Sequence, residues 1–189
     1  MRFVETELAG AWLLESEKNV DGRGYFTRLR CAREFAERDL PTAFVQTNLS
    51  YNRTSGTFRG LHYQAPPSQE GKLVRCIRGA IADVIVDLQP GSGSYLRHQW
   101  FRLDASEMAA LFVPAGFAHG FLTLTDESEV LYEMTDYYEP DLARGIRWDD
   151  PMLGIEMPGE VACVNPRDLT YPDLDIDTLS VFGESENDC

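Results

Sequence analysis

The sequence predicts an all-β fold, a β-sandwich or jelly roll in which short helices are accessories. Three observations lead to this prediction: short segments rich in β-branched and aromatic residues recur along the chain, turn signals separate them, and helical patterns are few. At 189 residues, with 43% hydrophobic residues, the chain can bury one sizeable core, which favours a single domain.

The predicted strands follow one another from residue 11 to residue 136. In chain order they are AWLLES (11–16), FVQTNLS (44–50), KLVRCIR (72–78), IADVIVDL (81–88), HQWFRL (98–103), AALFV (109–113), HGFLTL (119–124) and EVLYEMTD (129–136). A helical pattern is confined to CAREFAERDL (31–40) and part of residues 171–181. The sequence contains no internal repeat and no interior linker, which again indicates one domain.

Alternation within two of these strands indicates which side chains share a face. Asp83 lies on the same face as Ile81 and Ile85, so its carboxylate is a candidate for a polar site. Lys72 lies on the face of Val74, which would put its amine at the mouth of an apolar cavity. A surface lysine at the end of a strand fits the spacing of Lys72 equally well.

Charge restricts the classes of partner. Acidic residues exceed basic ones by 14, which argues against nucleic acid or an anionic membrane as partner, because both need a positive surface. Many basic residues fall in the first 80 positions, whereas residues 126–189 are mostly acidic. This asymmetry favours an anion site built from the first half, although any single one of these residues could be a solvated surface charge. The basic residues are Arg23, Arg28, Arg30, Arg53, Arg59, Lys72, Arg75 and Arg78.

The sequence also carries expectations about the cellular compartment. The opening MRFVETELAG does not have the basic and apolar pattern of a signal peptide, and no window approaches the roughly 18 apolar residues of a membrane span. The four cysteines are far apart and have no CxxC spacing, so we expect reduced thiols. A cytoplasmic protein that does not contact the membrane is expected.

The stretch TFRGLHYQAPP (57–67) contains one of only three histidines in the chain. His62 lies among an arginine, a tyrosine and a glutamine, just before a Pro-Pro turn. An imidazole is a suitable general base near neutral pH, so His62 is a candidate for proton transfer.

Eight stretches, in order along the chain, resemble the dTDP-4-dehydrorhamnose 3,5-epimerase family. They are DGRGYF (21–26), FVQTNLS (44–50), FRGLHYQAPP (58–67), GKLVRCIRG (71–79), DVIVDL (83–88), VPAGFAHGF (113–121), VLYEMTDYYEP (130–140) and GIRWDDP (145–151). The resemblance implies a cupin-type jelly roll, a homodimer whose sites are shared across subunits, and a nucleotide-diphospho-4-keto-6-deoxy sugar as substrate. It covers residues 1–170, which we expect to form the domain. Residues 171–189 would form a C-terminal extension with a mobile end.

The resemblance also implies catalytic roles. A C4 ketone acidifies the hydrogens on C3 and C5, so inversion needs a base on one face of the sugar and an acid on the other. His62 matches the base, Asp168 the carboxylate that orients it, and Tyr132 the acid. Lys72 would donate to the oxyanion that develops at C4, and Asp83 would keep that amine charged and aimed. No cofactor and no metal are expected.

Further positions match substrate-binding residues of the family. Phe26 would stack on the base and could come from the partner subunit, and His119 would line the pocket. His98 matches no functional position. The positions expected to bind the diphosphate are Arg23, Gln46, Asn48, Arg59 and Tyr138.

Three alternatives stay open at this level. PAGFAH (114–119) also fits a metal-binding cupin pattern with His62, Glu70 and His119 as ligands, although the usual H-x-H is absent. A catalytically silent binder of sugar nucleotides is the second alternative. The third is a CDP-linked substrate, because Arg28 replaces a glutamate of the family and could satisfy the N3 acceptor of cytosine. The sequence does not decide whether C3, C5 or both are inverted, nor which sugar or pathway is served.

Overall fold

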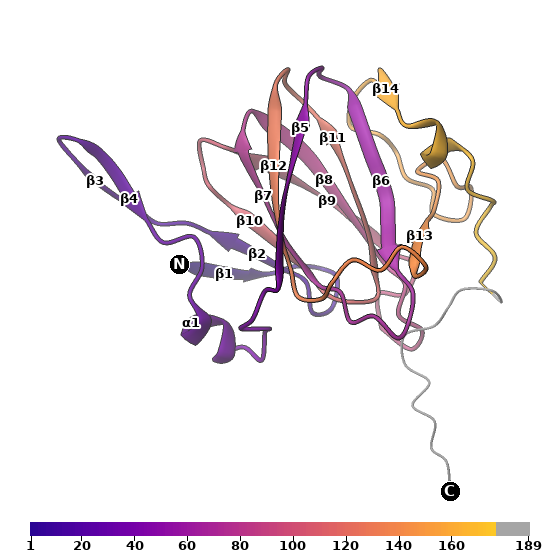
Figure 1. Cartoon of the computed structure of the whole chain (residues 1–189), viewed down its shortest axis with the longest axis horizontal. Helices are drawn as coiled ribbons and strands as arrows, with labels where there is room; N and C mark the ends of the chain where they lie inside the picture. Colours follow the sequence, from indigo (N-terminus) through magenta and orange to yellow (C-terminus); the bar gives the residue numbers. More distant parts are fainter. Residues whose placement is uncertain (177–189) are drawn as a thin grey trace, which may run out of the picture.

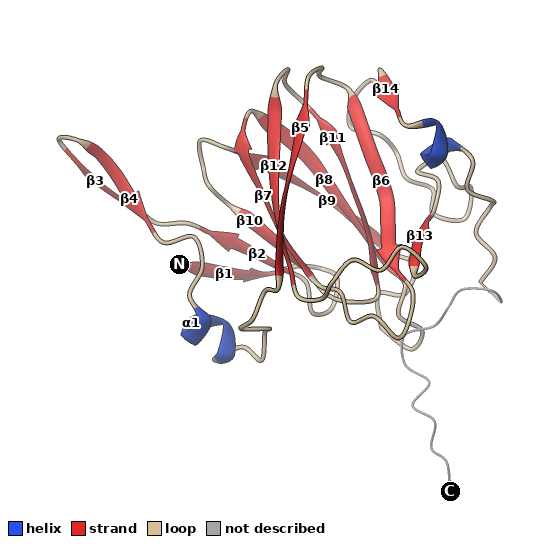
Figure 2. Cartoon of the chain, viewed as in Figure 1, coloured by secondary structure: helices blue, strands red, loops and turns tan. Residues whose placement is uncertain are grey.

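The computed structural model describes residues 1–176 and is built almost wholly of β-strands (Figures 1 and 2). The strands are β1 (Arg2–Glu5), β2 (Trp12–Glu15), β3 (Lys18–Asp21), β4 (Gly24–Thr27), β5 (Gln46–Asn52), β6 (Thr57–Gln64), β7 (Lys72–Arg78), β8 (Ala80–Asp87), β9 (His98–Asp104), β10 (Ala110–Val113), β11 (Phe117–Thr123), β12 (Ser128–Met134), β13 (Ala143–Gly145) and β14 (Cys163–Val164). The helical elements are α1 (Ala32–Ala36) and a 3-10 turn, η1 (Pro166–Leu169).

Two antiparallel sheets form the sandwich. One has the strand order β1-β2-β10-β7-β12-β5, and the other has the order β13-β6-β11-β8-β9, with β14 added parallel to β6. Several neighbouring strands are distant in sequence, as in β7 between β10 and β12, which is the crossing pattern of a jelly roll. The predicted cupin-type jelly roll is confirmed.

The core has a layer between the sheets and a layer outside each of them. Alternation along β8 places Ile81 and Ile85 between the sheets, whereas Val84 and Val86 face outward. The segment from Ile146 to Leu174 covers this outer face, and α1 covers part of the outer face of the other sheet through the fully buried Phe35. The C-terminal segment is therefore part of the packed domain where it passes β6 and β13.

The hairpin β3–β4 extends away from the sandwich (Figure 1). Its apolar side chains are in contact with solvent in the single chain: Val20 is 77% exposed and Phe26 is 72% exposed. Apolar side chains gathered on a projecting hairpin are typical of a contact surface.

All eight predicted strands are confirmed, but the observed helical structure is shorter than predicted. Each of the eight predicted strands corresponds to an observed one, but β6, which carries His62, was not predicted, and neither were β1, β3, β4, β13 and β14. The helix expected over 31–40 is only five residues long, and residues 171–176 are not helical. The rest of the second predicted helix, the expected mobile end and Cys189 lie outside the described residues. The boundary at residue 170 stays a prediction.

The described residues, 1–176, bear on two of the sequence expectations: the lack of a membrane span and the lack of paired cysteines. No helix in this range is long and apolar enough to cross a membrane. The described cysteines, Cys31, Cys76 and Cys163, are unpaired, as expected for reduced thiols.

Candidate active site

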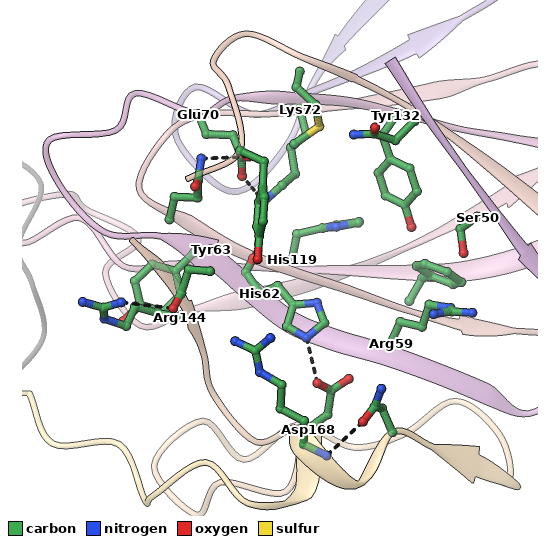
Figure 3. Close-up of a pocket in the computed structure, with 18 of the residues that line it drawn as sticks. Ser50, Arg59, His62, Tyr63, Glu70, Lys72, His119, Tyr132, Arg144 and Asp168 are labelled. Atoms are coloured by element: carbon green, nitrogen blue, oxygen red, sulfur yellow. Dashed lines mark hydrogen bonds and ion pairs between the residues drawn. The ribbon is translucent and has the colours of Figure 1, made fainter. Parts of the chain in front are cut away.

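A pocket of about 410 Å³ opens between the two sheets and is lined by strands of both (Figure 3). This volume lies within the range of small-molecule sites. Eight of the predicted site residues line the pocket, and they come from β5, β6, β7, β11, β12, η1 and the loop after β12. They are Asn48, Arg59, His62, Lys72, His119, Tyr132, Tyr138 and Asp168.

His62 and Asp168 form a hydrogen-bonded pair at one wall of the pocket. Asn165 caps the turn η1: its side-chain oxygen accepts from the backbone N–H of Arg167 at 2.9 Å, which fixes the start of the turn. The turn presents the buried Asp168 to β6, where its Oδ1 lies 2.9 Å from Nε2 of His62. The predicted pairing of these two residues is therefore present in the structure.

The negative charge of Asp168 determines which ring nitrogen of His62 carries the hydrogen. Burial by itself raises the pKa of Asp168, but the hydrogen bonds from His62 and from the backbone N–H of Gly60 bring it below its ordinary value. Asp168 is thus an ionised acceptor, so His62 donates through Nε2–H, and its other ring nitrogen points into the pocket (Figure 3). A neutral imidazole held in this tautomer can accept a proton from a ligand.

An irregularity in β6 brings Arg59 and His62 to the same pocket. On β11, His119 and Phe121 are two positions apart, whereas their partners on β6, His62 and Arg59, are three positions apart. The extra residue is a bulge that turns both side chains inward. It falls beside Gly60, where a Cβ atom would lie 2.5 Å from the Cα of Gly120, so both strands need glycine at this close approach.

Lys72 lies on the opposite wall, at the start of β7. Its Nζ lies 2.9 Å from Oε1 of Glu70 and donates to the backbone oxygen of His62 at 3.4 Å. Lys72 is part of the pocket lining, where its side chain is only 10% exposed, and its predicted place at the mouth of the cavity stays a prediction. Its ion-pair partner is Glu70, however, and not Asp83 as the sequence suggested.

Asp83 instead holds His119. Its Oδ2 lies 2.9 Å from Nε2 of His119, and the carboxylate is completely buried behind that ring. Burial raises the pKa of Asp83, while the nearby His119 and Lys72 oppose this shift. Asp83 therefore acts on the pocket only through the side chains in front of it.

Tyr132 projects from β12 into the pocket, with its hydroxyl directed toward Ser50, to which it is hydrogen-bonded (Figure 3). Burial raises the pKa of this phenol, and the nearby carboxylate of Asp83 raises it further. The ring packs edge-to-face on His119 with centroids 6.0 Å apart. Tyr132 keeps its proton at neutral pH, as a proton donor must.

The rim of the pocket is cationic although the whole chain is acidic. Arg59 donates to Oδ1 of Asn52 at 2.7 Å, and Arg144 donates to the backbone oxygen of Asp141 at 2.8 Å, so both have neutral partners. Arg167 lies over the ring of Tyr171 at 6.0 Å. Guanidinium groups with uncharged neighbours are available to an anionic ligand.

Sequence reasoning missed part of this lining. The basic cluster in the first half supplies Arg59 and Lys72, but Arg144 and Arg167 come from the acidic second half. The signal for both was available: Arg144 precedes the motif GIRWDDP, and Arg167 directly precedes Asp168. Tyr63, Ser50, Gln64, Asn165 and Tyr171 also line the pocket without having been predicted.

Five predicted residues are not in the lining. Arg23 is paired with Asp21 and its side chain is 91% exposed, while Phe26 projects on the same hairpin. Asp83 is buried behind His119, and Gln46 lies behind the rim, where its Oε1 accepts from the backbone N–H of Tyr138 at 3.3 Å. The fifth is Arg28.

The environment of Arg28 bears on the CDP alternative. Its guanidinium lies 3.0 Å from Oε1 of Glu34 on α1, away from the pocket of its own chain. A role for Arg28 in reading the nucleotide base therefore stays a prediction.

The three ligands of the metal alternative point to three different partners. His62 is paired with Asp168, His119 with Asp83, and Glu70 with Lys72. In residues 1–176, no three His, Cys, Asp or Glu side chains are gathered closely enough to hold a metal ion. The donor set therefore does not fit a metal site.

A jelly roll whose pocket contains an imidazole, an ammonium group and a phenol defines a cupin-type enzyme with groups suited to proton transfer. A family model described as dTDP-4-dehydrorhamnose 3,5-epimerase matches residues 5–175. The chain belongs to this family and is an isomerase-type enzyme.

Relatives from distant organisms agree with this assignment. The dTDP-4-dehydrorhamnose 3,5-epimerase of Methanothermobacter thermautotrophicus is 46% identical over 160 residues, 85% of this chain and 85% of that protein. The dTDP-4-dehydrorhamnose 3-epimerase of Streptomyces niveus is 34% identical over 169 residues, 89% of this chain and 81% of that protein. The epimerase of Legionella pneumophila, solved in complex with dTDP-4-keto-L-rhamnose, is 31% identical with a TM-score of 0.88, over 96% of this chain and 98% of that one.

Proposed function

We propose that this protein inverts C3, C5 or both in a nucleotide-diphospho-4-keto-6-deoxyhexose, and that it converts dTDP-4-dehydro-6-deoxyglucose to dTDP-4-dehydrorhamnose. One observation carries the proposal: the His62–Asp168 pair on one sheet faces Tyr132 and Lys72 on the other. A sugar ring held between the sheets then has a base on one side and an acid on the other.

The reaction follows from these positions. His62 removes the proton from the carbon next to the C4 ketone, and the electron pair moves to the C4 oxygen as an enolate. Asp168 stabilises the imidazolium that forms, and Lys72 donates to the oxyanion. Tyr132 then delivers a proton to the same carbon from the opposite face while the C4 carbonyl re-forms. Exchange with solvent restores the proton on Tyr132 and removes the one on His62.

The nucleotide end would be held at the cationic rim. Arg59 with Asn48 and Tyr138 would bind the diphosphate, and the 3.1 Å hydrogen bond from Gln46 to Oδ1 of Asn48 supports the position of that amide. Arg167 on η1 adds a further positive charge to the lining.

A homodimer completes the proposal. Because Arg23 and Phe26 stand on a hairpin that projects from the sandwich, they could reach the pocket of a second copy but not that of their own chain. The unpaired thiols at Cys31, Cys76 and Cys163 support a cytoplasmic location.

Solvent exchange tests the proposal. The protein is incubated in deuterated water with dTDP- or CDP-4-keto-6-deoxyglucose, and deuterium at C3 and C5 is followed by NMR. We expect exchange with the dTDP sugar, reduced about a hundredfold to ten-thousandfold in His62→Ala with dTDP binding retained. His98→Ala, on β9 and outside the pocket lining, is the matched control.

Each other outcome points to a different function. Wild-type exchange in His62→Ala would remove His62 as the base. Binding without any exchange would favour the silent binder, and faster exchange with the CDP sugar would favour the CDP-linked substrate.

A further inference from the structure

Lys72 is held by a carboxylate that is itself fixed at both oxygens. Glu70 Oε1 lies 2.9 Å from the ammonium nitrogen of Lys72, and Glu70 Oε2 accepts a hydrogen bond of 3.1 Å from Nε2 of Gln64. The Lys72 side chain is only 10% exposed and the Glu70 side chain only 5%. This is a buried ion pair with an additional neutral donor on the carboxylate.

Gln64 and the backbone of Glu70 connect the pair to two further segments. Oε1 of Gln64 accepts from the backbone N–H of Glu139 at 2.7 Å. The backbone N–H of Glu70 donates to Oγ of Ser68 at 3.2 Å, and that hydroxyl donates to Oδ2 of Asp136 at 3.0 Å. The carboxylate of Glu70 is therefore held directly by Gln64 at the end of β6, while the loop after β12 fixes Gln64 and, through Ser68, the backbone of Glu70.

Among the described residues, the ion pair with Glu70 and the hydrogen bond to His62 leave one N–H donor of Lys72 free to bind a ligand. An ammonium group has three N–H donors. In the described part of the chain, one is directed at Glu70 and a second at the backbone oxygen of His62, so one remains for an acceptor in the pocket. A buried ammonium without a counter-ion is strongly disfavoured, so the Glu70 carboxylate both compensates the charge of the ammonium group and sets its direction.

We propose that Glu70 is a positioning residue for the reaction, acting only through Lys72. It fixes the third donor of Lys72 toward the C4 oxygen of the sugar and neutralises the buried ammonium until the oxyanion forms. Glu70 does not touch the reacting atoms. This inference rests on the proposed function, in which Lys72 stabilises the oxyanion.

The test is a double-mutant cycle on turnover. Glu70→Gln keeps the shape of the side chain and removes its charge, and we expect kcat to fall about 10- to 100-fold while KM and dTDP affinity stay within about twofold of wild type. In a Lys72→Met background the same substitution should change kcat by less than about twofold, because Glu70 then has nothing to position. Glu127→Gln, which removes the partner of Arg78 at the surface, is the matched control.

The outcomes separate the two hypotheses. An unchanged kcat in Glu70→Gln, or an equal fall with and without Lys72, would overturn the positioning role. A wild-type kcat in Lys72→Met alone would instead overturn the proposed role of Lys72. If Glu70→Gln does not fold, the same cycle is run with Glu70→Asp, which keeps the charge but withdraws it from Lys72. That variant should lower kcat only when Lys72 is present, and a fall in both backgrounds would again overturn the proposal.

Discussion

Replacing Gly145 by alanine should disturb the active site through the C-terminal segment. Gly145 is the last residue of β13 and pairs with His62 across the sheet. The ring of Tyr171 lies directly over it, so that an added methyl carbon would overlap two ring carbons and lie 2.7 Å from the hydroxyl oxygen. Tyr171 also packs edge-to-face on His62, with centroids 6.5 Å apart, and stands three residues after Asp168.

The size of the effect follows from these contacts. Carbon atoms in ordinary contact are about 3.5–4.0 Å apart, so the ring must move by roughly 1 Å or more. The bond from His62 to Asp168 is 2.9 Å long, and such bonds tolerate only a few tenths of an ångström. Overpacking of this kind costs about 1–3 kcal/mol, a fall in Tm of roughly 2–12 °C for a chain of this size. A misplacement of about 1 Å at a catalytic group can lower the rate about a hundredfold.

The assay compares kcat, dTDP affinity and Tm in Gly145→Ala and in Gly93→Ala. The control glycine has no atom within 4 Å of an added methyl group and should be silent. Combining Gly145→Ala with Tyr171→Ala should give the kcat and Tm of Tyr171→Ala alone, because the overlap is gone. Wild-type kcat and Tm in Gly145→Ala, or no relief in the double variant, would refute this reasoning.

Three further predictions concern the acid, the metal and the pH dependence of stability. Tyr132→Phe should still exchange substrate hydrogen with deuterated solvent but form inverted product more slowly, and an equal loss of both would make Tyr132 a binding residue instead. Prolonged treatment with a chelator should leave turnover unchanged, because in the proposed mechanism Lys72 takes the role of the electrophile, and recovery of lost activity by one divalent metal would contradict this. Because the pKa of Asp168 is lowered on folding, its stabilising effect is present above its ordinary pKa of about 3.8 and is lost as pH falls through the lower folded value. The difference in urea midpoint between wild type and Asp168→Asn should thus shrink as pH falls below about 4, whereas an undiminished difference at pH 3 would contradict the linkage.

The strands of the sandwich could be predicted because burial imposes a short-range pattern. In β8, alternation correctly assigned Ile81 and Ile85 to one layer and Val84 to the other. In β6 the same rule fails, because the bulge beside Gly60 puts Arg59 and His62 on one face although they are three residues apart. A bulge depends on the strand that lies opposite, and a local pattern does not contain that strand.

The His62–Asp168 pair could be predicted only from resemblance to a family. The two residues are 106 positions apart, and the packing of the C-terminal segment on the outer face of the sheet brings them together. The resemblance suggested Asp83 as the partner of Lys72, whereas the ion pair is made by Glu70, two residues earlier in a loop. Loop residues do not follow the alternation of a strand, so the direction of their side chains cannot be predicted from sequence spacing and is known only from the structure.

In the proposed mechanism one base, His62, is sufficient for inversion at C3, at C5 or at both. In the proposed mechanism the substrate has the gluco configuration, in which the hydrogens on C3 and C5 are both axial and lie on the same face of the ring. His62 on one sheet can therefore approach either hydrogen, and Tyr132 on the other sheet can return a proton to either carbon, without a second acid–base pair. The other histidine of the pocket, His119, is held by the buried Asp83 and packs on Tyr132, so it supports the acid and does not need to act as a second base. In this mechanism the choice between one inversion and two depends on how the pocket lining holds the ring. Tyr63 is part of that lining, so Tyr63→Phe or Tyr63→Ala should change the ratio of deuterium exchange at C3 to exchange at C5, and an unchanged ratio would contradict this role.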